Sequence, residues 1–189
     1  FSPFSRIFIS FFFFFFSIKS HCVNVICEST GSACNAKFSE PIFCPRTIIE
    51  GREDNNSLVI NFIFDGGSIV NYFPHGLEKF FPNLAQLQFL KGRLKKLQEH
   101  DFRMLGALEH LDLSDNDLEA LERDVFKNNR GLRAIVLNRN NLKFIHPSIF
   151  DDILLYYFSM LGPQCITGDY NGLDEVEIAK NSFAEKCND

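Results

Sequence analysis

Histidine, cysteine and acidic side chains carry most acid–base, nucleophilic and metal chemistry, and this chain of 189 residues has five histidines, six cysteines and 24 acidic residues. The histidines are spread along the chain, at His21, His75, His100, His110 and His146. None belongs to an H-E-x-x-H pattern, and no G-x-S-x-G pattern occurs. Because no acid, base and nucleophile can be grouped by their spacing, we predict that the protein is not an enzyme and uses no cofactor.

One acidic segment has the spacing of a calcium-binding loop, with carboxylates at Asp115, Asp117 and Glu119. Such a loop needs Gly at its sixth position and Glu at its twelfth, where this chain has Ala120 and Phe126. We therefore interpret the segment as a turn, and we predict no metal site.

The first residues have the layout of a secretory signal peptide. Arg6 precedes the apolar run IFISFFFFFF, no acidic residue occurs before Glu28, and the small residue Ser20 can precede a cleavage site. We predict a signal peptide over residues 1–20, with an incomplete start because residue 1 is Phe, and hence a secreted, extracellular protein. The alternative is that the Phe run is an artefact, a translated homopolymer tract.

Charge and hydropathy argue against two kinds of partner. The formal net charge of the whole chain is -5, and removal of residues 1–20 removes two basic residues and no acidic one. An acidic protein of this kind is not expected to bind nucleic acid. No segment supplies the roughly 20 apolar residues that a membrane-spanning helix needs, so we predict no membrane span.

The cysteines lie in two groups, which an even count in a secretory chain indicates are disulfide-bonded. No Cys-x-x-Cys pair occurs, which argues against a metal site. If each group pairs internally, Cys165 pairs with Cys187, whereas the four remaining cysteines allow three pairings. Those four are Cys22, Cys27, Cys34 and Cys44. Asn55 begins the only N-x-S/T sequon, so we predict glycosylation there.

The middle of the chain is a tandem repeat with a period of 24 residues. Residues 108–121 fit the pattern L-x-x-L-x-L-x-x-N-x-L-x-x-L at every marked position. The same phases hold apolar residues one period earlier, over 84–97, and one period later, over 132–145. A Phe recurs in the same phase of each copy, at Phe102, Phe126 and Phe150. Three copies in register predict a repeat architecture.

Two less regular copies flank these three, around Phe62–Ile69 and Phe158–Met160. Together the copies resemble the leucine-rich repeat family in its extracellular form, and the terminal cysteines resemble its disulfide-closed caps. The segment Phe73–Leu84 also resembles short secreted leucine-rich repeat proteins of insects. In the family, an Asn satisfies backbone groups in the turn after each strand. Asn116 and Asn140 keep it, and Gly67, Gly92 and Pro163 replace it.

Alternate residues of a strand point to opposite faces, so the repeated leucines point inward and stacked copies bury them. We predict an α/β solenoid: a leucine-rich repeat arc of five strands, with a short parallel sheet on the concave face and disulfide-bearing N- and C-terminal caps. The expected segments are an N-terminal cap over 21–57, repeats over 58–160, and a C-terminal cap over 161–189.

The basic run Lys91, Arg93, Lys95 and Lys96 has two interpretations. It could bind an anionic ligand, but one period later it aligns with Asp115, Asp117 and Glu119. Residues one period apart are neighbours on adjacent turns, so we predict ion pairs between repeats.

The outward positions of the strands form the candidate binding surface. They are Asn61, Ile63, Gln86, Gln88, His110, Asp112, Ala134, Val136, Tyr157 and Ser159, with Leu90, Lys91, Ser114, Asp115, Asn138 and Arg139 at the strand ends. From these we select Gln86, Gln88, Leu90, His110, Asp112, Val136 and Asn138 as ligand-binding residues, because apolar residues with a polar surround can anchor a protein contact.

Two functions follow from the resemblance. The first is a secreted, non-catalytic protein that binds a protein partner through its concave face, in extracellular recognition or defence. The alternative is a structural component of an extracellular matrix or assembly that associates with itself.

Overall fold

The computed structural model describes residues 25–30, 33–38, 60–66, 71–74 and 76–188. The predicted signal peptide, Asn55, Cys22 and Cys44 lie outside these residues. In the part of the chain that is described, no helix has the length and apolar character needed to cross a bilayer.

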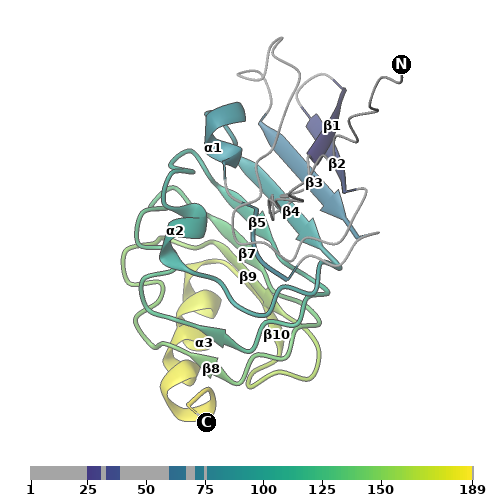
Figure 1. The fold of residues 1–189 in the computed structure, drawn as a ribbon. Coiled ribbons are helices and arrows are strands. Elements are labelled where there is room, and N and C mark those ends of the chain that lie inside the picture. The colour runs from purple at the N-terminus through teal and green to yellow at the C-terminus, as the bar shows by residue number, and fades with distance from the viewer. Residues whose placement is uncertain (1–24, 31–32, 39–59, 67–70, 75, 189) are drawn as a thin grey trace, which may run out of the picture.

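The fold is a solenoid whose turns contribute to one sheet of eight strands (Figure 1), which confirms the predicted architecture. Neighbouring strands are parallel from β2 to β9, whereas β1 and β10 pair antiparallel at the two ends. In sheet order the strands are β1 (Val25–Thr30), β2 (Ala33–Phe38), β3 (Asn61–Asp65), β4 (Gln86–Leu90), β5 (His110–Asp112), β7 (Ala134–Val136), β9 (Tyr157–Met160) and β10 (Gly168–Asn171).

The five strands predicted from the repeat are β3, β4, β5, β7 and β9, and each pairs in the register that the period sets. Leu87, for example, pairs with Leu111, which pairs with Ile135. The inward residues of all five strands are buried, with at most 1% of their surface exposed. Burial of each such side chain contributes about 1.5–3 kcal/mol. Stacking of the copies therefore builds the core that one copy cannot build alone.

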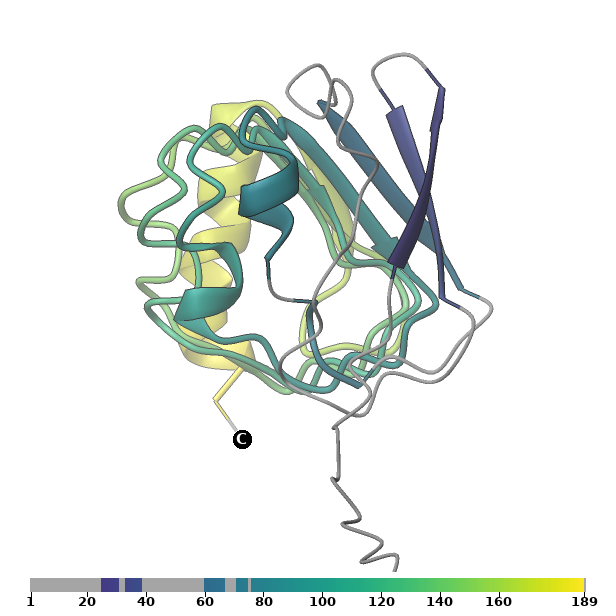
Figure 2. The ribbon, with the colours of Figure 1, turned by 45° about the horizontal axis from the view of Figure 1, so that its top comes forward.

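The side of the solenoid opposite the large sheet holds helices (Figure 2). The helices are α1 (Leu77–Phe80), α2 (Glu99–Phe102) and α3 (Leu173–Lys186), and a separate two-stranded sheet is formed by β6 (Ala120–Leu121) and β8 (Phe144–Ile145). Behind these elements the periodic Phe side chains stack: ring centroids of Phe102 and Phe126 are 5.5 Å apart, and those of Phe126 and Phe150 6.0 Å apart. The recurring Phe is therefore the core of this side.

Asparagines in the turns after the strands tie neighbouring repeats together. Asn116 Nδ2 donates to the carbonyl oxygens of Phe89, Leu113 and Ser114, and Asn140 repeats the pattern one turn later. In the last turn Pro163 stands in place of the Asn, as the sequence indicates, and the next residue takes over its hydrogen bonds: Gln164 Nε2 donates to the carbonyls of Leu137 and Leu161, at 3.0 and 3.4 Å.

Each end of the solenoid has its own cover. At the C-terminal end, α3 buries Val176, Ala179 and Phe183, and the Phe183 ring lies 6.0 Å from that of Phe150. The predicted Cys165–Cys187 disulfide is present. At the N-terminal end, strand β2 extends the sheet beyond β3, and its Cys34 is buried and disulfide-bonded.

The predicted ion pairs between repeats form only in part. Arg139 binds Asp115 in a bidentate pair, with Nε–Oδ1 at 2.5 Å and Nη2–Oδ2 at 2.6 Å. Lys91 binds Asp65 of the preceding turn, at 2.7 Å, rather than Asp115. In the described residues, no ion pair within 4.0 Å joins Arg93 to Asp117 or Lys95 to Glu119, and all four residues are exposed.

Candidate binding site on the concave sheet face

The register of the sheet sorts the outward side chains into two rows that cross the strands. The first row runs through Asn61, Gln86, His110, Ala134, Tyr157 and Asn171, and the second through Asn35, Ile63, Gln88, Asp112, Val136, Ser159 and Asp169. Each residue of a row comes from a different strand. Ser159, which was predicted to be a surface residue, is fully buried in its row, where its hydroxyl donates to Asn138 Oδ1. The repeat period thus brings residues far apart in the sequence onto one continuous face.

A hollow of about 260 Å³ lies in the centre of this face. Its position follows from side-chain size: Ala134 is the smallest residue of its row, and it lies between the imidazole of His110 and the ring of Tyr157 on the flanking strands. The hollow is lined by Gln86, Leu87, Gln88, His110, Leu111, Asp112, Ala134, Val136 and Tyr157.

Asp112 is held in one orientation on this face. Its Oδ1 accepts hydrogen bonds from the Ser114 amide, at 2.9 Å, and from the Ser114 hydroxyl, at 2.6 Å. Within the described residues, no hydrogen bond or ion pair engages Oδ2. The carboxylate of Asp112, which lines the hollow, is therefore fixed through one oxygen, and its other oxygen is not engaged by any described residue.

Tyr157 is positioned by the last strand of the sheet. Its hydroxyl donates to Asp169 Oδ1 on β10, at 3.0 Å. Partial burial raises the pKa of Tyr157, and the hydrogen bond to Asp169 and the charges of Asp169 and Asp112 raise it further. The phenol accordingly stays protonated and serves as a fixed aromatic wall.

Five of the seven predicted site residues line the hollow: Gln86, Gln88, His110, Asp112 and Val136. The other two, Leu90 and Asn138, do not line it and lie at the carboxyl ends of their strands. Asn138 Oδ1 already accepts from the Ser159 hydroxyl and the Leu161 amide, each at 2.7 Å. The role of all seven residues in ligand binding stays a prediction.

Three residues of the face were left out of the predicted site. The repeat register assigned Ala134 and Tyr157 to the sheet surface. The small side chain of Ala134 beside the large ring of Tyr157 is the feature of the sequence from which the hollow could have been predicted. Asp169 gave no such signal, because it belongs to β10, a strand outside the repeat.

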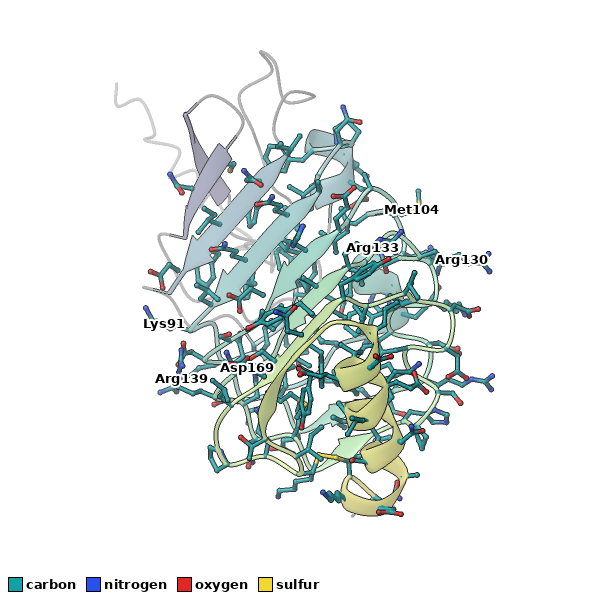
Figure 3. All side chains as sticks on the ribbon, turned by 180° about the vertical axis from the view of Figure 1, so that it is seen from behind. Lys91, Met104, Arg130, Arg133, Arg139 and Asp169 are labelled. Carbon is teal, nitrogen blue, oxygen red and sulfur yellow. A yellow bond between two sulfur atoms is a disulfide. The ribbon has the colours of Figure 1, made fainter. Side chains whose placement is uncertain are left out.

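The basic side chains lie around this face rather than on it. None of the strands from β3 to β10 in the concave sheet contains Lys or Arg. Figure 3 shows Lys91 and Arg139 at one margin of the sheet and Arg130 and Arg133 at the other. The strands of this face from β3 to β10 consequently carry the carboxylates of Asp112, near the centre, and Asp169, on the last strand, with no Lys or Arg among them, and the charge of Asp112 acts on Arg139 at the margin.

His110, Asp112 and Ser114 are close in sequence, yet their geometry is not that of a catalytic triad. The Ser114 hydroxyl donates to Asp112 and not to an imidazole, so no histidine is placed to take its proton as in a triad. Among the described residues, no group of three or more His, Cys, Asp or Glu side chains could hold a metal ion. What the arrangement offers is a shaped, mildly acidic surface.

Comparison with known proteins agrees with this geometry. Residues 107–157 match the leucine-rich repeat family. No curated protein matches at a significant level. Two of the solved structures that match are of the Toll–Spatzle complex, described as a molecular hub in Drosophila development and innate immunity.

The first of these matches has 24% identity and a TM-score of 0.49 over 59% of this chain and 16% of that chain. The glycosylated form of the complex gives 24% identity and a TM-score of 0.53 over 61% and 17%. This chain thus spans less than a fifth of the length of those chains. The likeness to the glycosylated form shows the fold, a leucine-rich repeat solenoid, and the family match covers residues 107–157.

Proposed function

We propose that the protein is a secreted, non-catalytic recognition protein, similar to short leucine-rich repeat proteins of insects, that binds a protein partner through its concave face. The observation that carries the proposal is the hollow at Ala134, with His110 and Tyr157 on either side and a fixed carboxylate at its edge. Side chains of this mixture, on a rigid sheet, suit the insertion of one side chain from a partner surface.

Two further features support the proposal. The face side chains are positioned by a continuous sheet whose inward residues are fully packed, so little conformational entropy is lost when a partner binds. The fold is also shared with chains solved in a protein complex, the Toll–Spatzle complex, although that likeness by itself concerns the fold.

The experiment is site-specific photo-crosslinking in native extracellular fluid. A photoreactive residue replaces Gln88, on the concave face, and in a matched protein it replaces Arg123, on the opposite side of the solenoid. We expect a defined adduct from position 88 that is absent from position 123. Equal adducts from both positions, or an adduct only from position 123, would contradict the assignment of the concave face.

Self-association is a second candidate, favoured by the exposed apolar residues near the C-terminal end. Leu154, Tyr156 and Leu173 are 52%, 47% and 42% exposed. Leu154 and Leu173 line one groove beside α3, and the amide of Gly172 donates to the carbonyl of Tyr156. Light scattering over a range of concentrations tests this candidate. A mass that stays at that of one chain up to high concentration would exclude it.

A further inference from the structure

We infer that the hollow on the concave face accepts a basic side chain of the partner, with arginine as the best fit. The inference rests on the proposed function, because it assigns the chemistry of the group that this surface recognises. It is carried by three observations on the described residues: an oriented carboxylate with one oxygen that no described residue engages, flat rings on both sides of a small residue, and two side-chain amides that make no hydrogen bond there.

The carboxylate is the first observation. Ser114 fixes Asp112 through Oδ1 before any ligand arrives, Asp112 lines the hollow, and within the described residues no hydrogen bond engages its second oxygen. A cation that meets it forms a charge-assisted hydrogen bond, which is about twice as strong as a neutral one. Asp169, which receives the Tyr157 hydroxyl, adds negative potential on the same row of the sheet. Charge complementarity therefore favours a positive ligand.

The shape of the hollow is the second observation. His110 and Tyr157 extend from strands on either side of β7, and strands two apart in a sheet are separated by about 10 Å. Ala134 leaves the space between the two rings open. A guanidinium group is planar and stacks on aromatic faces, whereas an ammonium group is a compact and strongly hydrated point charge. The flanking rings thus favour arginine over lysine.

The amides are the third observation. Gln86 and Gln88 line the hollow from β4, and in the described part of the chain their side chains make no hydrogen bond. Their carbonyl oxygens are acceptors for the remaining N–H groups of a guanidinium, which carries five donors in a fixed fork. Gln88 pairs directly with Asp112 across the sheet. Acceptors therefore stand next to the carboxylate and not only opposite it.

The test uses a small probe and needs no knowledge of the partner. The purified, disulfide-bonded full chain, labelled with ¹⁵N, is titrated with N-acetyl-argininamide and followed by NMR. The matched probe is N-acetyl-citrullinamide, which has nearly the same shape and no charge. We expect millimolar binding of the arginine probe, with shifts centred on Asp112, Ala134 and Tyr157. The citrulline probe should bind at least about tenfold more weakly, since it lacks the charge-assisted bond.

Two variants complete the test. Asp112→Asn keeps an oxygen that accepts from Ser114 but removes the charge, so it should weaken arginine binding about tenfold or more. Asp117→Asn makes the same charge change at an exposed residue that does not line the hollow, and it should bind the probe as the unaltered chain does.

The inference is overturned if the arginine probe causes no shifts on the concave face, if citrulline binds equally well, or if Asp112→Asn leaves binding unchanged. Failure here can be told apart from failure of the proposed function. A crosslinked partner at position 88 together with no response to arginine would remove only the basic-ligand assignment. Arginine binding without any crosslinked partner would remove the protein-recognition role and leave the assignment intact.

Discussion

Asn116 Nδ2 donates to the carbonyl oxygen of Phe89, 27 residues earlier in the chain, at an N–O distance of 2.7 Å. The same side chain accepts, through Oδ1, the amides of Gly92 and Leu94 at 3.0 and 3.1 Å. One buried amide therefore satisfies backbone groups on two successive turns. This relationship holds the strands in the register that places Gln88 beside Asp112.

Replacement of Asn116 with Ala should lower the free energy of unfolding by about 3 kcal/mol, because it leaves several buried backbone groups without partners. Urea unfolding followed by circular dichroism measures the change. Asn141→Ala is the control, since Asn141 is exposed and its side chain makes no hydrogen bond within the described residues. Equal losses in the two variants would show that Asn116 does not join the turns.

Gly92→Ala should destabilise the fold by about 1–3 kcal/mol, because an added Cβ would lie 2.5 Å from Phe89 Cε1 and 3.0 Å from Asn116 Oδ1. The Phe89 ring is buried and packs 4.6 Å from the ring of Phe64, so it has little room to move. Gly106→Ala is the matched control, since nothing lies within 4 Å of its Cβ position. A Gly92→Ala protein as stable as Gly106→Ala would contradict the close packing described for this turn.

Removal of the Cys165–Cys187 disulfide by the double change to Ala should reduce the free energy of unfolding by about 3 kcal/mol. The bond closes a segment with a sequence separation of 22 residues, which contains β10 and α3, so its loss frees the cover of the last repeat. Urea unfolding gives the size of the loss. Hydrogen exchange shows which elements lose protection: faster exchange should be confined to α3, β10 and β9. Uniform acceleration in β4 and β5 as well would argue against a local cover.

Asp101 should make stability depend on pH between about 4 and 6. The Asp101 side chain is only 6% exposed, and this burial raises the pKa of its carboxyl to about 6. The hydrogen bond from the Gln98 amide and the charge of His100 lower the pKa, but by less than burial raises it. The unfolded chain ionises first as the pH rises, so the folded state loses stability through this window. Relative to Asp101→Asn, the unaltered protein should lose roughly 1–3 kcal/mol from pH 4 to pH 7. A difference that stays constant with pH would show that Asp101 is not perturbed.

The sequence predicts the middle of the fold better than its ends for a physical reason. Leu111, Ile135 and the stacked Phe126 recur at fixed intervals, because every internal turn meets the same packing on both sides. Strand β10 has no such constraint, since its polar residues pair with β9 on one side only. Its contribution to the site, Asp169, was therefore missed.

Residues that have a structural role in only one repeat are equally hard to predict from the sequence. Asn129 is fully buried and donates to the carbonyls of Phe102 and Leu105, at 2.9 Å each. The same phase of the neighbouring repeats holds Leu105 and Ile153, so periodicity indicates an apolar residue there. Gln164 likewise donates to a backbone carbonyl as the repeat asparagines do, although it lies one position later in the repeat. The hollow belongs to this class, because it arises from the contrast of Ala134 with the larger side chains beside it.

The central claim is that a partner protein binds at the hollow of the concave face. The most direct measurement is the dissociation constant of the crosslinked partner, once purified, for two variants of this chain. Ala134→Leu fills the floor of the hollow without changing charge, and Ala107→Leu makes the same change at an exposed loop residue that does not line it. We predict a loss of about tenfold or more for Ala134→Leu and no change for Ala107→Leu. Unchanged affinity for Ala134→Leu would contradict the claim.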